Sequence, residues 1–191
     1  TEKKQAEKSN RKNNERLESL LRLAQQSFHT NQELLDYALH EAIELTESEF
    51  GYIYYYDENT RQFMLNTWSK GVMDACNVLN PPNVYDLDNT GCWGEAVRQR
   101  KPILINDYSY DNQYVKGTPE GHVKIDKFLT IPIFADNQIV AVLGVINKRV
   151  DYDNDDIRQL TLLMDNVWKM VEKQNVQQQL LEAKEKAEES D

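Results

Sequence analysis

Cysteine is scarce in this sequence, with only Cys76 and Cys92 among 191 residues and no CxxC spacing between them. Two such cysteines cannot build a disulfide framework, which points to a reducing, cytoplasmic setting. The three histidines are scattered as well, so the sequence lacks the ligand spacing of a metal site. We therefore expect a protein without a bound metal.

Long apolar runs and an excess of positive charge are also lacking. No run approaches the roughly 20 residues of a membrane span, and the N-terminal stretch TEKKQAEKSNRK lacks the apolar core of a signal peptide. The net charge of −10 argues against nucleic acid or an anionic membrane as the main partner. The length allows one domain of about 150 residues with extensions.

The strongest positive signal is a β-hairpin within residues 127–148. Its arms, residues 129–134 and 139–146, are rich in β-branched and aromatic residues, and Asp136-Asn137 supplies a turn that tolerates positive φ. The second arm is apolar at nearly every position, which is typical of a strand buried on both faces. We expect helices on one face and a loop-built pocket on the other.

Three helical patterns flank the hairpin. One starts at Leu17 and ends near residues 29–30, and a second follows a capping box formed by Thr30 and Glu33. The third begins at an acidic turn near Asp153 and continues with few apolar residues to Ser190, or about 57 Å at 1.5 Å per residue. Such a helix is longer than its own domain and indicates a connector.

The remaining segments complete an α+β fold. Strands are expected at residues 53–56, 62–68, 85–87 and 103–105, and a short helix capped by Asn89 or Thr90 at residues 91–100. Residues 106–123 read as a folded covering loop. The order predicts an antiparallel sheet of five to six strands, with the N- and C-terminal helices packed on one face and the pocket loops on the other.

Five ordered motifs give this pattern a family resemblance. They are Asn66-Thr67-Trp68-Ser69, Gly94 to Pro102, Asn106-Asp107-Tyr108, Pro119-Glu120-Gly121-His122 and Asp156 to Met164. Together they resemble the GAF domain, a small-molecule sensing fold, as it occurs in bacterial sensor histidine kinases and related signalling proteins. Residues 183–191 resemble the helix that enters the dimerisation and phosphoacceptor domain of such kinases.

The resemblance implies a division into three parts: an N-terminal signalling and dimerisation helix at residues 1–29, a GAF sensor domain at 30–172, and a coiled-coil connector at 173–191 toward a kinase output domain. The chain itself would be a cytoplasmic, non-enzymatic input module. The ligand is unknown. A small organic molecule is compatible with the sequence, which carries no nucleotide-binding or tetrapyrrole-attachment motif.

A ligand pocket in this topology lies between the sheet and the crossing loops. We predict a lining of aromatic and polar side chains: Trp68, Met73, Cys76, Trp93, Tyr108, Tyr114, Lys116 and His122. His122 and Lys116 suit a carboxylate or carbonyl group on the ligand. The alternatives are that the two tryptophans only complete the core and that His122 only anchors its loop.

The terminal helices are predicted to form a homodimer. The residues expected at this parallel seam are Leu17, Leu20, Leu21, Ala24, Phe28, Leu160, Met164, Val167 and Val171. Alternatively, these stripes pack on the domain's own sheet. Two other functions also remain open at this point: a spacer that only dimerises, and a thiol enzyme similar to the GAF-type methionine sulfoxide reductases, with Cys92 as a nucleophile of lowered pKa.

Overall fold

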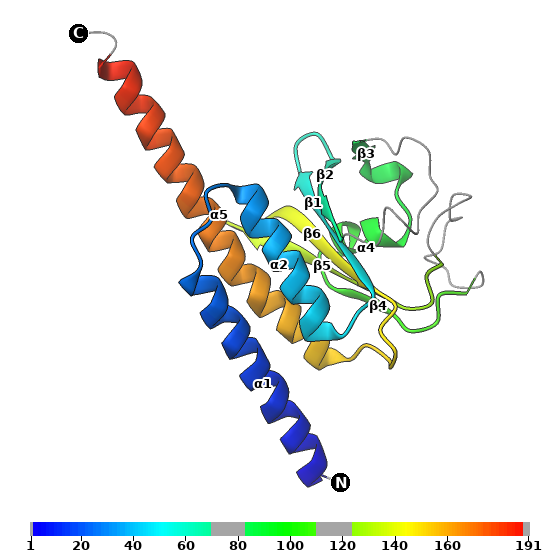
Figure 1. Ribbon diagram of the computed structural model, residues 1–191. Coiled ribbons are helices and arrows are strands. Elements are labelled where there is room, and N and C mark those ends of the chain that lie inside the picture. The colour runs from blue at the N-terminus through cyan, green and yellow to red at the C-terminus, as the bar shows by residue number, and fades with distance from the viewer. Residues whose placement is uncertain (1, 70–82, 110–123, 189–191) are drawn as a thin grey trace.

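One antiparallel sheet forms the centre of the protein in a computed structural model, which describes residues 2–69, 83–109 and 124–188 (Figure 1). The described chain contributes six strands in the order β3-β2-β1-β6-β5-β4. Their bounds are Phe50–Asp57 (β1), Gln62–Trp68 (β2), Val84–Asp86 (β3), Ile103–Ile105 (β4), Phe128–Ala135 (β5) and Gln138–Ile146 (β6). The strand pairs are all antiparallel.

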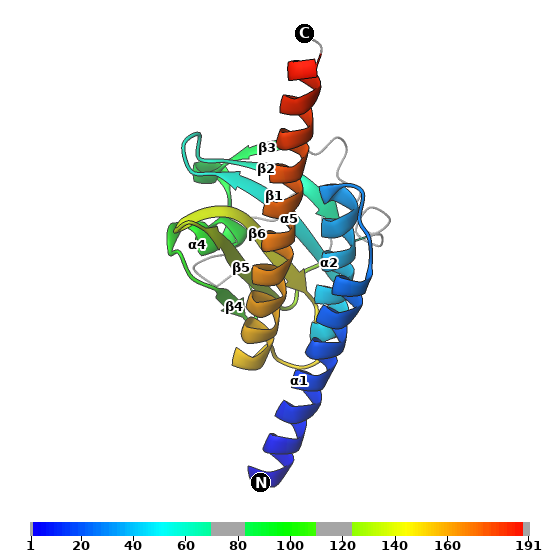
Figure 2. The ribbon, with the colours of Figure 1, turned by 90° about the vertical axis from the view of Figure 1, so that its left-hand side faces the viewer.

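The helices divide between the two faces of this sheet. The long helices α1 (Glu2–Gln25), α2 (Asn31–Thr46) and α5 (Asn154–Glu188) lie together on one face, as Figures 1 and 2 show. The 3-10 turn η1 (Leu87–Asn89) and the short helix α4 (Cys92–Arg98) lie on the other. The predicted α+β architecture is confirmed.

The central hairpin forms as the sequence predicts. Asp136 and Asn137 have φ values of 47° and 65°, which is the type I′ turn that suits a two-residue hairpin loop. The pairing shifts register between Ile133 and Phe134, just after Pro132, whose missing N–H disfavours a regular central strand. Every residue of β6 from Ala141 to Ile146 is buried, so this strand is covered on both faces.

Helix ends differ from the sequence prediction at several places, and α1 begins at Glu2 and not at Leu17. Helix α1 ends at Gln25, before a short linker; Thr30 then caps α2 by accepting a hydrogen bond from the Glu33 amide at 3.1 Å. The cap predicted at Asn89 or Thr90 is wrong, because Gly91 is the N-cap of α4. The Thr90 hydroxyl instead donates to the Leu87 carbonyl at 2.7 Å.

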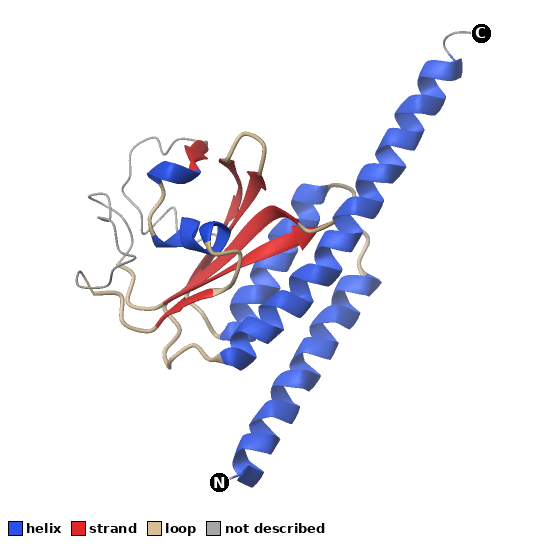
Figure 3. Cartoon of the chain, turned by 180° about the vertical axis from the view of Figure 1, so that it is seen from behind, coloured by secondary structure: helices blue, strands red, loops and turns tan. Residues whose placement is uncertain are grey.

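The C-terminal helix α5 is 35 residues long, about 52 Å at 1.5 Å per residue. Its first half covers the sheet and its second half extends past the rest of the domain (Figure 3). None of the helices in the described chain combines the length and apolar character needed to cross a membrane.

The residues predicted for a dimer seam separate into two groups. Leu160, Met164, Val167 and Val171 are buried in the core between α5, α2 and the sheet, as the alternative reading of that stripe expects. Leu20 and Phe28 pack partly against the same core. On α1, Leu17 and Leu21 are each 57% exposed, and Ala24 is exposed as well.

This burial predicts opposite outcomes for two leucines of α5. Leu160→Ala should lower the free energy of unfolding by about 2–5 kcal/mol, because it leaves a cavity in the core. Leu181→Ala, at a 56% exposed position, should stay within about 0.5 kcal/mol of the wild type. Urea unfolding of both variants checks the assignment, and equal losses would contradict it.

Candidate functional site

Aromatic side chains cover the sheet face that lies opposite the long helices. Alternation along β1 turns Ile53 and Tyr55 toward the helices and Tyr52, Tyr54 and Tyr56 to the other side. The other contributors to this second face come from β2, β3 and α4. We call the set of Tyr52, Tyr54, Phe63, Trp68, Tyr85 and Trp93 the aromatic wall.

Trp93 lies at the centre of the aromatic wall. Its ring centroid is 5.1 Å from that of Tyr54, 4.7 Å from Phe63 and 5.5 Å from Tyr85. Trp68 is partly buried against the same cluster. The structure therefore brings these two predicted ligand residues together, and both take part in packing the domain.

Two residues of the second family motif fix α4 over the sheet. The Arg98 guanidinium donates to the carbonyls of Leu87 at 2.7 Å and Thr90 at 2.6 Å, and it pairs with Glu95 at 2.6 Å. A Cβ at Gly94 would lie 1.9 Å from the Thr90 hydroxyl oxygen, so only glycine fits there. These contacts explain why Trp93 reaches the sheet at a defined place.

Tyr52 lies flat across the central strand. It pairs with Gly144 in the sheet, where a Cβ would be 2.1 Å from Tyr52 Cζ and 2.3 Å from its hydroxyl oxygen. That hydroxyl is buried and has no hydrogen-bond partner in the described structure. The nearby Thr130 hydroxyl donates to the Leu143 carbonyl at 3.2 Å. Burial raises the pKa of Tyr52 more than the Thr130 hydroxyl lowers it, so the Tyr52 hydroxyl keeps its proton and can donate a hydrogen bond to an acceptor.

Cys92 and Tyr108 form a polar pair beside Tyr52. The Cys92 sulfur lies 3.1 Å from the Tyr108 hydroxyl, and the thiol is 3% exposed. Burial raises the pKa of Cys92 more than the hydrogen bond with Tyr108 lowers it. The alternative in which Cys92 has a lowered pKa at the start of α4 is therefore wrong, and a protonated buried thiol is a poor nucleophile.

Tyr108 is placed by the third family motif. The side-chain amide of Asn106 donates to the backbone carbonyl of Tyr152 at 3.0 Å, and its oxygen accepts from the backbone N–H of Tyr152 at 2.8 Å. The Tyr108 amide then donates to the Asp126 carbonyl at 3.0 Å. These bonds hold the end of β4 against the segment that follows β6, so the Tyr108 side chain meets Cys92.

The other five predicted ligand residues, Met73, Cys76, Tyr114, Lys116 and His122, lie outside the described residues. Sequence reasoning missed Tyr52, because its signal depends on how the strands pair. Once β1 and β6 are paired, the alternation of tyrosines in β1 places one of them opposite the glycine of β6.

An open groove of about 410 Å³ lies on the helix side of the sheet, where α2 begins. Its lining residues come from β1, β2, β6, the start of α2 and the middle of α5: Asn31, Tyr55, Tyr56, Asp57, Gln62, Met64, Val140, Trp168, Val171 and Asn175. None of the predicted ligand residues lines it. Within residues 2–69, 83–109 and 124–188, no three acidic, histidine or cysteine side chains gather as metal ligands would.

Comparison with known families agrees with this arrangement. The family model of the GAF domain matches residues 29–172. This chain belongs to the GAF domain family. A curated relative from Methanosarcina acetivorans, described as a methyl sulfide methyltransferase-associated sensor, is 42% identical over 180 residues. That match covers 94% of this GAF domain chain and 18% of the relative, so the chain spans less than a fifth of that protein.

Solved structures share the fold at low sequence identity. The free methionine-R-sulfoxide reductase of Neisseria meningitidis has a TM-score of 0.66 at 13% identity, covering 88% of this chain and 92% of that one. The GAF domain of a putative sensor histidine kinase from Pseudomonas syringae has a TM-score of 0.59 at 14% identity, covering 96% and 99%. Both likenesses concern the fold alone.

The unpaired hydroxyl of Tyr52 makes a testable difference to stability. Tyr52→Phe should leave the ligand-free protein as stable as the wild type or raise its free energy of unfolding by up to about 1–3 kcal/mol, since a buried unpaired group is removed. Tyr152→Phe, which loses a 2.7 Å hydrogen bond to Ser48, should cost about 1 kcal/mol. Urea unfolding compares the two, and an equal loss in both would show that the Tyr52 hydroxyl is paired.

Proposed function

We propose that this GAF domain is the cytoplasmic input module of a signal-transduction histidine kinase. It binds a small molecule against the aromatic wall and relays binding through the terminal helices of a homodimer. It performs no reaction itself. The observation that carries the proposal is the buried, unpaired Tyr52 hydroxyl at an aromatic surface, because such a donor is stabilised when a ligand supplies the acceptor.

The chemistry of the wall sets the class of ligand. Aromatic rings supply most of its surface, and Tyr52, Cys92 and Tyr108 supply a few convergent polar groups, as in small-molecule sites generally. A small organic molecule with a carbonyl or carboxylate group matches this lining. His122 and Lys116, which lie outside the described residues, would add a donor and a positive charge from the covering loop.

The assignment to a kinase rests on sequence and relatives. The Methanosarcina acetivorans relative is described as a sensor, and a GAF domain of a putative sensor histidine kinase shares the fold. Helix α5 extends beyond the domain as a connector would. We accordingly divide the chain into a signalling helix at residues 1–29, a sensor domain at 30–172 and a connector at 173–191.

The paired helices are proposed to be α1 and α5, which run in the same direction (Figure 1). Lys12 contacts Asp156 and the Phe28 carbonyl contacts Gln174, so residues of α1 lie level with residues about 145 positions later in α5. Leu17 is therefore near the level of Leu162.

The α5 seam must use residues other than the buried stripe that the sequence suggested. Leu162, Val176 and Leu180 are exposed, and their separations of 14 and 18 residues place them on one side of a helix with 3.6 residues per turn. With Leu17 and Leu21 of α1, they offer a second copy an apolar surface opposite the core.

One observation favours the alternative of a spacer that binds no ligand. Trp93 contacts three aromatic rings and so fills part of the space that a ligand would take. A thiol enzyme similar to the methionine-R-sulfoxide reductases is less well supported, because burial keeps Cys92 protonated.

Ligand binding can be tested by a thermal-shift screen of small carboxylic acids and carbonyl compounds. A ligand at 100 times its Kd should add about 2.7 kcal/mol to the free energy of unfolding and raise the Tm. Tyr52→Phe and His122→Ala should each reduce that shift, whereas Tyr152→Phe, on the opposite side of the sheet, should preserve it. An unchanged affinity in His122→Ala would refute the role of His122, and an unchanged affinity in Tyr52→Phe would refute the site.

Dimerisation can be tested by light scattering after gel filtration. The wild type should show twice the chain mass of 22.3 kDa. Replacing Leu17 and Leu21 together by serine should shift the protein toward monomer, because both side chains leave the seam. Leu181→Ser, on a different side of α5, is the matched control and should stay dimeric. A monomeric wild type, or a double variant that pairs as strongly, would contradict the seam.

A further inference from the structure

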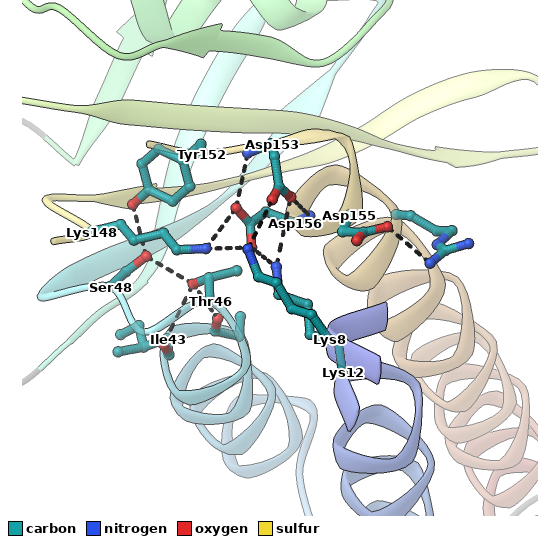
Figure 4. A network of polar contacts seen from close by, with 12 residues as sticks. Lys8, Lys12, Ile43, Thr46, Ser48, Lys148, Tyr152, Asp153, Asp155 and Asp156 are labelled. Carbon is teal, nitrogen blue, oxygen red and sulfur yellow. Dashed lines mark hydrogen bonds and ion pairs between the residues drawn. The ribbon is translucent and has the colours of Figure 1, made fainter. Parts of the chain in front are cut away.

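A buried cluster of charges joins α1 to the rest of the domain. Asp156, in the first turn of α5, is fully buried and accepts hydrogen bonds from two lysines (Figure 4). Lys148, which follows β6, reaches both of its carboxylate oxygens at 2.7 Å. Lys12 of α1 reaches one of them at 3.0 Å. The Asp153 amide donates to the other at 3.0 Å. We call these four residues the Asp156 junction.

Contacts that do not involve α1 join the surroundings of the Asp156 junction to α2. Tyr152 and Ser48 are hydrogen-bonded through their hydroxyls at 2.7 Å, and Ser48 is bonded to Thr46 at 2.8 Å. The Lys148 ammonium lies 5.8 Å from the centre of the Tyr152 ring. These contacts join β6, the start of α5 and the end of α2 into one body without any contribution from α1 (Figure 4).

The two lysines hold Asp156 unequally. Breaking a buried ion pair is costly chiefly when it leaves a charge unpaired. If α1 moved away, Asp156 would keep both bonds from Lys148 and the bond from the Asp153 amide. The Lys12 ammonium would enter water, and Asp153, its second partner at 3.6 Å, is already 43% exposed. Departure of α1 therefore strands no buried charge at this junction.

Few apolar side chains of α1 are buried where it packs on the rest of the domain. Leu23 is the one fully buried apolar residue of α1 within its described side chains. Asn13, next to Lys12, has a buried side-chain oxygen without a partner. Gln159, one turn after Asp156 on the same face of α5, has two such atoms. Separation would hydrate these groups, which reduces the cost of moving α1.

A further charged contact joins α1 to α2. Arg22 is 50% exposed and pairs at 2.8 Å with Glu41 of α2, whose side chain is only 6% exposed. If α1 left, Arg22 would be solvated and Glu41, which α1 helps to cover, would meet water. Release therefore breaks this half-buried pair, but Glu41 keeps its hydrogen bond with Tyr37 of the same helix.

We propose that α1 is a separately docking helix, which leaves α2 and α5 as a unit while the rest of the domain stays folded, with the Lys12–Asp156 ion pair setting the docked population. The inference goes beyond ligand sensing and holds whether or not the aromatic wall takes a ligand. It gives the domain a two-state element at the junction where β6, α2 and α5 meet.

Hydrogen–deuterium exchange of the whole chain at pH 7, followed by mass spectrometry, tests this. In the wild type, amides of α1 should exchange faster than those of α2 and of the β5–β6 hairpin. Lys12→Met should speed exchange in α1 by about tenfold or more, the effect of losing a charge-assisted hydrogen bond, with α2 and the hairpin within about twofold of the wild type. Lys8→Met is the matched control, because Lys8 loses the same charge one turn away and has only an exposed contact at 3.8 Å; it should leave α1 within about twofold.

A second variant separates docking from folding. Lys148→Met removes the lysine that holds both Asp156 oxygens, so exchange should rise in α2, α5 and the hairpin together. All samples are compared at one protein concentration, so that pairing of copies affects them equally. The proposal is overturned if α1 and the hairpin exchange at one common rate in the wild type, if Lys12→Met accelerates all regions by the same factor, or if Lys12→Met behaves like Lys8→Met.

Discussion

Burial of β6 on both faces is the constraint on which the rest of the structure depends. Helices α2 and α5 cover one face of this strand, and aromatic side chains from β1, β2 and α4 cover the other. A register slip of one residue would exchange the two sets of side chains, so the pairing is strongly specified. Gly144 is the glycine of β6, and the Tyr52 ring occupies the space that a side chain at this position would need. The same strand thus forms the floor of the candidate site and the support of the helices.

This shared strand provides a short physical route between the two functions proposed for the domain. Val142 contacts the aromatic wall, while its neighbours Leu143 and Ala141 contact the helix layer. Close-packed interiors transmit displacement because they have few voids, so a change in ring packing on one side of β6 bears directly on α5. Immediately after β6, Lys148 meets Asp156 at the start of α5. The proposed ligand site and the proposed signalling helices therefore need no intermediate element.

The sequence predicts most of the fold because its periodic patterns are strong. It does not predict features that depend on long-range polar contacts or on the register between strands. The hairpin, the short strands and the long exit helix follow from apolar patterning and turn residues. The first turns of α1 carry no apolar pattern, and their docking depends on Lys12 meeting Asp156, which is 144 positions away. A stripe such as that of Leu160 shows that a helix buries one side, but not which partner covers it. Tyr52 could be recognised only once β1 was placed in register with β6.

The account's central claim is that one face of the sheet holds a small molecule and that the other carries paired helices. Native mass spectrometry of the protein as purified, compared with its mass after denaturation, tests both parts together. The account predicts a dimer of the 22.3 kDa chain with additional mass that is lost on denaturation, and this mass would narrow the identity of the ligand. A monomer of bare chain mass, unchanged after incubation with small carboxylic acids and carbonyl compounds, would contradict it.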